Sequence, residues 1–237
     1  MAQVFGLLLF TLRPAATLLA ALAVIASANP RAAGAQDGLA FDRQLEHFTQ
    51  LAIEGKTEEA TAMLRQPGFL AGADREGHTA LFAAAVACNT AVLDEVLALS
   101  PELNHRDNKG ATALFYAASE GRLEALRRLI RHGADVNVPD ANQRTPLMAA
   151  VLMNQVNASR LLLDAGARIN SQDRDGATAL LDAVESGRYE VAQLLLQRGA
   201  DARLARHNGI TPLQAAQTKA NPKLVDLLRH DEGAAQF

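Results

Sequence analysis

Residues 107–137 read DNKGATALFYAASEGRLEALRRLIRHGADVN, and residues 140–170 read DANQRTPLMAAVLMNQVNASRLLLDAGARIN. The second stretch repeats the first at an interval of 33 residues, with an opening Asp, a Thr five residues later and a closing Gly-Ala. The same frame recurs along most of the chain, and its Thr residues are Thr79, Thr112, Thr145, Thr178 and Thr211. A fixed period of this length indicates a repeat architecture, in which each unit buries its apolar face by stacking on its neighbours.

The frame predicts two helices in each unit. Each Thr is expected to be a helix N-cap, because its hydroxyl can accept a hydrogen bond from an unpaired backbone N–H. Pro146 and Pro212 follow the Thr directly and suit the first helical position. Glycines are expected at the turn between the two helices (Gly121, Gly187) and at the end of the second helix (Gly133, Gly166, Gly199).

This pattern resembles the ankyrin repeat proteins, in particular short exported bacterial members, because a Thr-Pro-Leu core at about this period is typical of them. The resemblance implies an all-α repeat solenoid with a 33-residue period, built of helix–turn–helix units that are joined by β-turn hairpin loops. Residues 74–205 are expected to form four ankyrin repeats.

The units at the two ends of the array depart from the frame. Residues 36–73 lack the Thr-Pro-Leu core and are interpreted as an N-terminal capping repeat. The side chains that are expected to face the stack are Phe41, Leu45, Phe48 and Leu51. Residues 206–237 are interpreted as a C-terminal capping repeat with a short second helix over 224–228.

Residues 1–35 resemble a secretory signal peptide. Arg13 precedes an apolar run, and two small-x-small sites predict cleavage after Ala35 or after Ala28. The expected location is periplasmic or secreted. The alternative is a membrane anchor formed by an uncleaved N-terminal helix, although the run after Arg13 is short for a span of about 20 residues.

Composition and motifs argue against several classes of function. The net charge of −3 offers no basic footprint for nucleic acid. The six His residues and the single Cys show no metal-ligand spacing, and no nucleophile or phosphate-loop motif is present. We therefore expect no enzyme activity, no cofactor and no metal site, and we expect Cys88 to be a partly buried structural thiol.

Several positions break the repeat frame. Gln143, Cys88 and Asn154 stand where other units have glycine, and Ser100-Pro101 replaces a Gly-Ala. We interpret these replacements as ordinary sequence variation between repeats. Asp182 differs from them, because it replaces an Ala or Tyr of the other units near the expected core, and a buried carboxylate needs a partner.

The resemblance implies a concave surface that binds other proteins through the hairpin tips and the first helix of each unit. The candidate binding residues by position are Arg75, His78, Lys109, Asn142, Arg144, Leu152, Met153, Arg174, Asp175 and His207. Leu152 and Met153 form an apolar pair where neighbouring units are polar, which is typical of a binding patch. The alternative is that a helix end folds over this pair.

The sequence thus predicts an exported, monomeric, non-enzymatic module or scaffold that binds a protein partner. The resemblance to exported bacterial ankyrin proteins suggests that this partner is an exported enzyme, which the module supports or inhibits. Two alternatives stay open: a small-molecule or haem carrier that assists an envelope stress enzyme, and a secreted effector that acts in a host.

Overall fold

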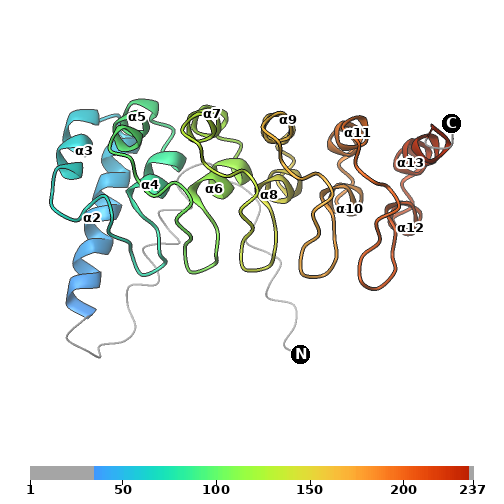
Figure 1. Ribbon diagram of the computed structural model, residues 1–237, viewed down its shortest axis with the longest axis horizontal. Helices are drawn as coiled ribbons and strands as arrows, with labels where there is room; N and C mark the ends of the chain where they lie inside the picture. Colours follow the sequence, from blue (N-terminus) through green and yellow to red (C-terminus); the bar gives the residue numbers. More distant parts are fainter. Residues whose placement is uncertain (1–34, 235–237) are drawn as a thin grey trace.

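The computed structural model describes residues 35–234, which form a stack of helix pairs (Figure 1). The stack opens with α2 (Ala35–Ile53) and α3 (Thr57–Leu64). The first helices of the next five units are α4 (Ala80–Val86), α6 (Ala113–Ser119), α8 (Pro146–Leu152), α10 (Ala179–Glu185) and α12 (Pro212–Thr218). Their second helices are α5 (Thr90–Ala98), α7 (Leu123–Arg131), α9 (Val156–Asp164), α11 (Tyr189–Gln197) and α13 (Pro222–Ala234).

The helices lie in two rows, and loops project from one side of them. Figure 1 shows α5, α7, α9, α11 and α13 in an outer row, with the inner row of α4, α6, α8, α10 and α12 beneath it. A hairpin loop precedes each inner helix and points away from the outer row. Among residues 35–234 the only strand-like pairing is an isolated bridge between Gln172 and Thr178, so the expected all-α repeat solenoid is confirmed.

Threonine caps start most of the inner helices. The hydroxyls of Thr112, Thr145, Thr178 and Thr211 each accept a hydrogen bond from the backbone N–H three residues later. Pro146 and Pro212 occupy the first turn, as expected. The prediction is wrong for Thr79, whose backbone is extended like that of the other caps but whose hydroxyl accepts no such bond.

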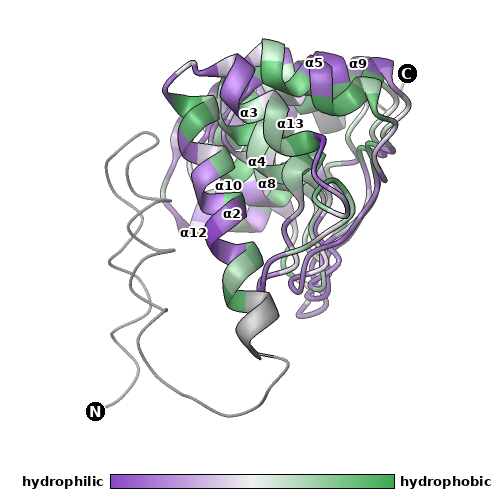
Figure 2. Ribbon diagram, turned by 90° about the vertical axis from the view of Figure 1, so that its left-hand side faces the viewer, coloured by the Kyte–Doolittle hydropathy of each residue, from purple (hydrophilic) through white to green (hydrophobic). Residues whose placement is uncertain are grey.

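Stacked apolar rows hold the units together. The Leu two residues after each Thr is 1 % exposed in the four units at Leu81, Leu114, Leu147 and Leu180. The Ala five residues after each Thr is also buried, which lets adjacent inner helices approach. Figure 2 shows the apolar side of the helices turned inward and the hydrophilic loops extending outward.

The first helix pair packs against this core at one end. Leu45, Phe48 and Leu51 of α2 are buried, and Phe41 is half-buried. The rings of Phe41 and Phe48 lie 5.6 Å and 5.4 Å from that of Phe69. Burial of aromatic side chains on this scale gives a large apolar contribution to stability.

At the other end, the last outer helix is longer than expected. It runs over Pro222–Ala234, thirteen residues, and not only over 224–228. Pro222 suits the first helical position, and the Asn221 side chain accepts from Leu224 N at 3.3 Å, so the helix begins earlier than its apolar residues indicate.

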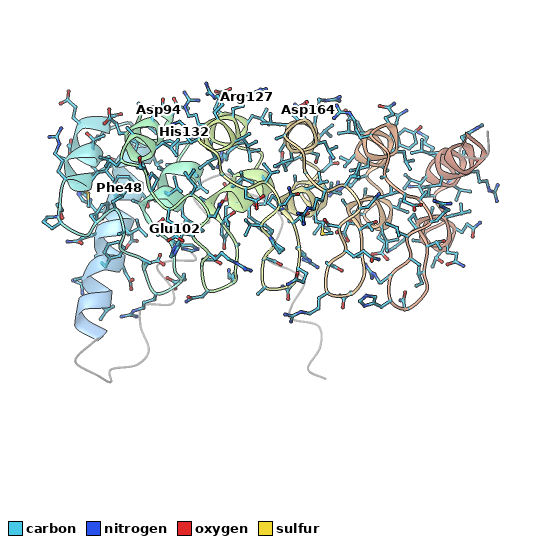
Figure 3. All side chains as sticks on the ribbon, in the orientation of Figure 1. Phe48, Asp94, Glu102, Arg127, His132 and Asp164 are labelled. Atoms are coloured by element: carbon cyan, nitrogen blue, oxygen red, sulfur yellow. The ribbon has the colours of Figure 1, made fainter. Side chains whose placement is uncertain are left out.

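Ion pairs join neighbouring outer helices. Arg128 Nε lies 2.7 Å from Asp94 Oδ1, and Arg198 Nη1 lies 2.7 Å from Asp164 Oδ1. Both aspartates are labelled on the outer row in Figure 3. The pairs are exposed, so each contributes only modestly to stability.

Residues that replace glycine keep the glycine backbone conformation. The φ values are 61° at Cys88, 53° at Ser100, 62° at Gln143 and 57° at Asn154. Ala220, which the sequence analysis did not identify, has a φ of 50°. These non-glycine residues are therefore held in the left-handed region by the repeat frame. Cys88 is exposed on its inter-helix turn, so the expectation of a partly buried thiol is wrong.

Candidate concave binding surface

We call the surface made by the hairpin tips and the exposed sides of the inner helices the groove, after the concave surface that the family resemblance implies. In each of the four units from Asp74 onward, the opening Asp shapes the hairpin: Asp107 Oδ1, for example, accepts from Lys109 N at 2.9 Å and from Ala111 N at 2.8 Å. Asp74, Asp140 and Asp173 repeat this pattern. These internal hydrogen bonds hold the hairpins in one conformation.

Adjacent tips are also joined to one another through their backbones. Asn108 N donates to Glu76 O at 2.8 Å, and Ala141 N donates to Lys109 O at 2.7 Å. The next two junctions repeat the contact through Arg174 N and His207 N. Since the tips are tied in register, the groove loses little conformational entropy when a ligand binds.

Most of the predicted tip residues reach solvent. Lys109, Asn142, Arg174, Asp175 and His207 are exposed. Arg75 is exposed as well, and its Nε lies 3.1 Å from Asp42 Oδ2 of the first helix pair. The structure thus brings these side chains to one edge of the groove.

His78 is held between two units. Its Nδ1 lies 3.3 Å from Asp74 Oδ2, and its Nε2 lies 3.4 Å from Asp107 Oδ2 of the next unit. Burial lowers the pKa of His78, but the hydrogen bond and the attraction to Asp74, together with the attraction to Asp107, outweigh burial and raise it. His78 therefore links two repeats, and only 23 % of its side chain remains exposed.

The apolar pair in the middle unit lies at the end of α8. Met153 is 45 % exposed, and Leu152 is half-buried. The corresponding positions on either side are polar: Ser119 and Glu120 before, Glu185 and Ser186 after. The surface of the groove is therefore apolar at its centre and polar in the adjoining units.

Charged side chains lie near Asp182 in the first turn of α10, the inner helix of the next unit. Asp182 is 6 % exposed, and its Oδ2 has no hydrogen-bond partner among the described residues. Its charged neighbours are Asp173, Arg144, Arg206 and Glu185. Burial, followed by repulsion from Asp173, raises the pKa of Asp182 to about 7 although both arginines act in the opposite direction.

The two arginines beside Asp182 are bound differently. Arg206 Nη2 lies 2.9 Å from Glu185 Oε2. Arg144 makes only a 3.7 Å contact from Nε to Asp173 Oδ2. The sequence analysis identified Asp182 and Arg144 as candidates but not Arg206. The signal that could have found it is a change of charge, because the first residue of each unit is acidic at Asp74, Asp107, Asp140 and Asp173 and basic at Arg206.

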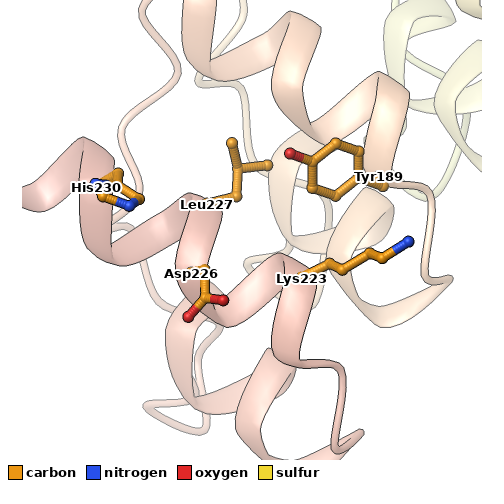
Figure 4. Close-up of a pocket in the computed structure, with 5 residues that line it drawn as sticks. All are labelled: Tyr189, Lys223, Asp226, Leu227 and His230. Carbon is orange, nitrogen blue, oxygen red and sulfur yellow. The ribbon is translucent and has the colours of Figure 1, made fainter.

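A hollow lies outside the groove. It has a volume of about 550 Å³ between α11 and α13 and is lined by Tyr189, Lys223, Asp226, Leu227 and His230 (Figure 4). It is open and lined by few side chains, and no sequence motif points to it. Drug-sized ligand sites are concave and enclose most of their ligand, so this hollow is a weaker candidate than the groove.

Residues 35–234 contain no group of three or more His, Cys, Asp and Glu side chains arranged to hold a metal ion. None of the helices in this part of the chain combines the length and the apolar character that crossing a membrane requires. The predicted signal peptide over 1–35 lies outside the described residues, apart from Ala35 at the start of α2.

Comparison with known proteins gives the family. The family model "Ankyrin repeats (3 copies)" matches residues 86–173, 125–206 and 168–236. A crystal structure of an ankyrin repeat domain from Acinetobacter baumannii AYE is similar, with 30 % sequence identity, a TM-score of 0.70, and coverage of 78 % of this chain and 97 % of that chain. No curated protein matches. The chain belongs to the ankyrin repeat family, whose members are generally protein–protein interaction modules.

Proposed function

We propose that this protein binds a protein partner in the groove, with Leu152 and Met153 at the centre of the contact, and that it has no enzyme activity of its own. The observation that carries the proposal is the exposure of Met153, 45 %, beside half-buried Leu152 on a face whose hairpin tips are joined by backbone hydrogen bonds. Binding energy is concentrated in a few central apolar contacts that a polar rim shields from water.

The rim indicates the chemistry of the partner. Lys109, Arg144 and Arg174 lie along the hairpins, and Arg144 and Arg174 belong to the two units nearest Met153. Complementary charge favours the correct orientation and speeds association. A partner with an apolar side chain for the centre and acidic residues toward the hairpins fits this surface.

Site-specific photo-crosslinking tests the groove directly. A photoreactive amino acid at Met153 is expected to capture a partner in vivo, while the same amino acid at Arg160, exposed on the outer helix α9, is expected to capture none. The captured protein must then bind the purified chain, and Leu152→Ser/Met153→Glu must weaken that binding. Capture from Arg160 alone would place the interface on the outer helices and contradict the proposal.

The proposal includes export through residues 1–35, with the partner an exported enzyme that the module supports or inhibits. Cleavage after Ala35 would leave a chain that begins at Gln36, and cleavage after Ala28 one that begins at Asn29. Cell fractionation with N-terminal sequencing tests this. An intact Met1 on protein from the cytoplasmic fraction would overturn the export claim.

A further inference from the structure

Asp182 occupies an unusual place in the groove. Counting from the Thr of each unit, the equivalent residues are Ala83, Tyr116, Ala149 and Ala215. Three of these are apolar, and Tyr116 donates its hydroxyl to Asp107 Oδ2 at 2.7 Å. Asp182 has only 6 % exposure and leaves Oδ2 without a partner in the described part of the chain. An unsatisfied buried carboxylate is costly, so this position calls for an explanation.

Arg144 is the cationic neighbour of Asp182 that has no close acidic partner. Among residues 35–234, the Nε atoms of Arg144 and Arg206 are both buried without a hydrogen-bond partner, and the nearest ion-pair contact of Arg144, to Asp173 Oδ2, is 3.7 Å long. The Arg144 side chain is 42 % exposed. Arg206, the other cation near Asp182, instead forms an ion pair with Glu185, with Nη2 2.9 Å from Oε2.

The elements packed around Asp182 define its charge environment. Asp173 and Glu185 repel its negative charge, and Arg144 and Arg206 attract it. The flanking helices α8 and α12 carry no titratable side chain. Behind α10, helix α11 contributes Tyr189 and Glu190, both exposed. Arg144 is thus the one cation near Asp182 that has no close acidic partner.

We propose that Arg144 receives a carboxylate side chain of the protein partner, and that the protonation state of Asp182 controls this receptor. When Asp182 is neutral, the Arg144 guanidinium remains available to the groove. When Asp182 is ionised, its carboxylate attracts the guanidinium and competes with the partner. This inference rests on the proposed function of the groove.

The chemistry supports an acidic ligand. A guanidinium binds a carboxylate through two parallel N–H···O hydrogen bonds, which is among the strongest polar contacts in proteins. Lys109 and Arg174 add positive charge along the same rim. Because burial and Asp173 raise the pKa of Asp182 to about 7, the change of charge falls near neutral pH.

The test uses sodium acetate as the probe and the full chain as the protein. The Nε–H signals of Arg144 and Arg206 are followed by NMR, with sodium chloride at matched ionic strength and neutral acetamide as controls. Acetate is expected to shift the Arg144 signal saturably, and with it the signal of Arg206, which shares Asp182 as a neighbour, whereas chloride and acetamide are expected to shift neither signal. The apparent affinity is expected to fall about tenfold between about pH 6 and about pH 8, because binding requires neutral Asp182.

Three variants separate the roles. Arg144→Gln is expected to abolish the saturable response, read at Arg206, while Arg174→Gln at the neighbouring tip is expected to leave it unchanged. Asp182→Asn mimics the neutral side chain, so it is expected to keep the low-pH affinity at all pH values. An unchanged response in Arg144→Gln, or an unchanged pH dependence in Asp182→Asn, would overturn the proposal.

The outcome is distinguishable from that of the groove test. If Met153 captures a partner but acetate fails to bind, the groove stands and the Arg144 receptor is wrong. If acetate binds as described but no partner is captured through Met153, the assignment of the carboxylate to a protein partner is wrong.

Discussion

The hydroxyl of Tyr116 donates a 2.7 Å hydrogen bond to Asp107 Oδ2 in the second unit after the first helix pair. Two units later, Asp182 takes the place of Tyr116 in the frame, and Asp173 takes the place of Asp107. A donor–acceptor pair is thereby replaced by two acids. Repulsion from Asp173 is the second largest cause, after burial, of the raised pKa of Asp182.

Replacing Asp182 by Ala, the residue of three other units, should stabilise the protein at neutral and higher pH. The folded-state pKa of Asp182 is raised to about 7 from 3.8, so ionisation makes folding less favourable as pH rises between these values. We expect Asp182→Ala to raise the free energy of unfolding by about 2 kcal/mol above pH 7 and by little near pH 4, measured by urea unfolding. Asp175→Ala, which removes an exposed acid, is the control. Equal effects at both pH values would contradict this explanation.

The contribution of His78 to the free energy of unfolding should depend on pH over a different pH range. Its folded-state pKa is raised above 6.5, so its contribution is fully present below pH 6.5 and is lost as pH rises through the folded-state pKa. We expect His78→Gln to cost about 1 kcal/mol of unfolding free energy near pH 6, with a smaller cost near pH 9. His207→Gln, at an exposed tip, should show no such trend. If the loss of unfolding free energy in His78→Gln does not vary with pH, protonation of the His78 ring does not contribute to stability.

Gln143 should be a site where glycine is better than the native residue. Its φ is 62° at the turn position where four other units have glycine, and side chains in this region are strained. We expect Gln143→Gly to stabilise the protein by about 0.5–1 kcal/mol, since the relief of strain is partly offset by the greater freedom of glycine in the unfolded chain. Asn154→Gly at φ 57° should change stability less, because Asn tolerates this conformation. The shift of the denaturation midpoint gives both values, and a destabilised Gln143→Gly would refute the argument.

The central apolar pair should affect binding but not folding. Leu152→Ser with Met153→Glu introduces the residue types of the preceding unit, Ser119 and Glu120. We expect the fold to persist by circular dichroism, while calorimetry with the captured partner shows binding weakened by about 2–4 kcal/mol. Arg160→Ala on the outer helix is the matched surface control. Loss of the fold would show that the pair belongs to the core, and normal binding by a folded variant would move the interface elsewhere.

Local backbone requirements were readable from the sequence. Thr112 and Thr145 were predicted to cap helices, and Gly133 and Gly166 to end them, because such positions depend mainly on a residue's own backbone and its near neighbours. The burial of Phe48 followed from apolar spacing. The exposure of Cys88 did not, because glycine occupies the same turn position at Gly121 and Gly187 and gives no indication of where a side chain would point.

The 33-residue period by itself determined the order of the helices, their caps and the stacking of units, since each of these repeats with local sequence. Only the tertiary structure decided which side chains lie near one another across units: Asp182 near Arg144 and Arg206, and His78 within 3.4 Å of Asp107. Those contacts depend on how far one unit overlaps the next and on which side-chain atoms are shielded from water. Burial then sets the electrostatics, because a charge removed from water responds far more strongly to its neighbours than a solvated one.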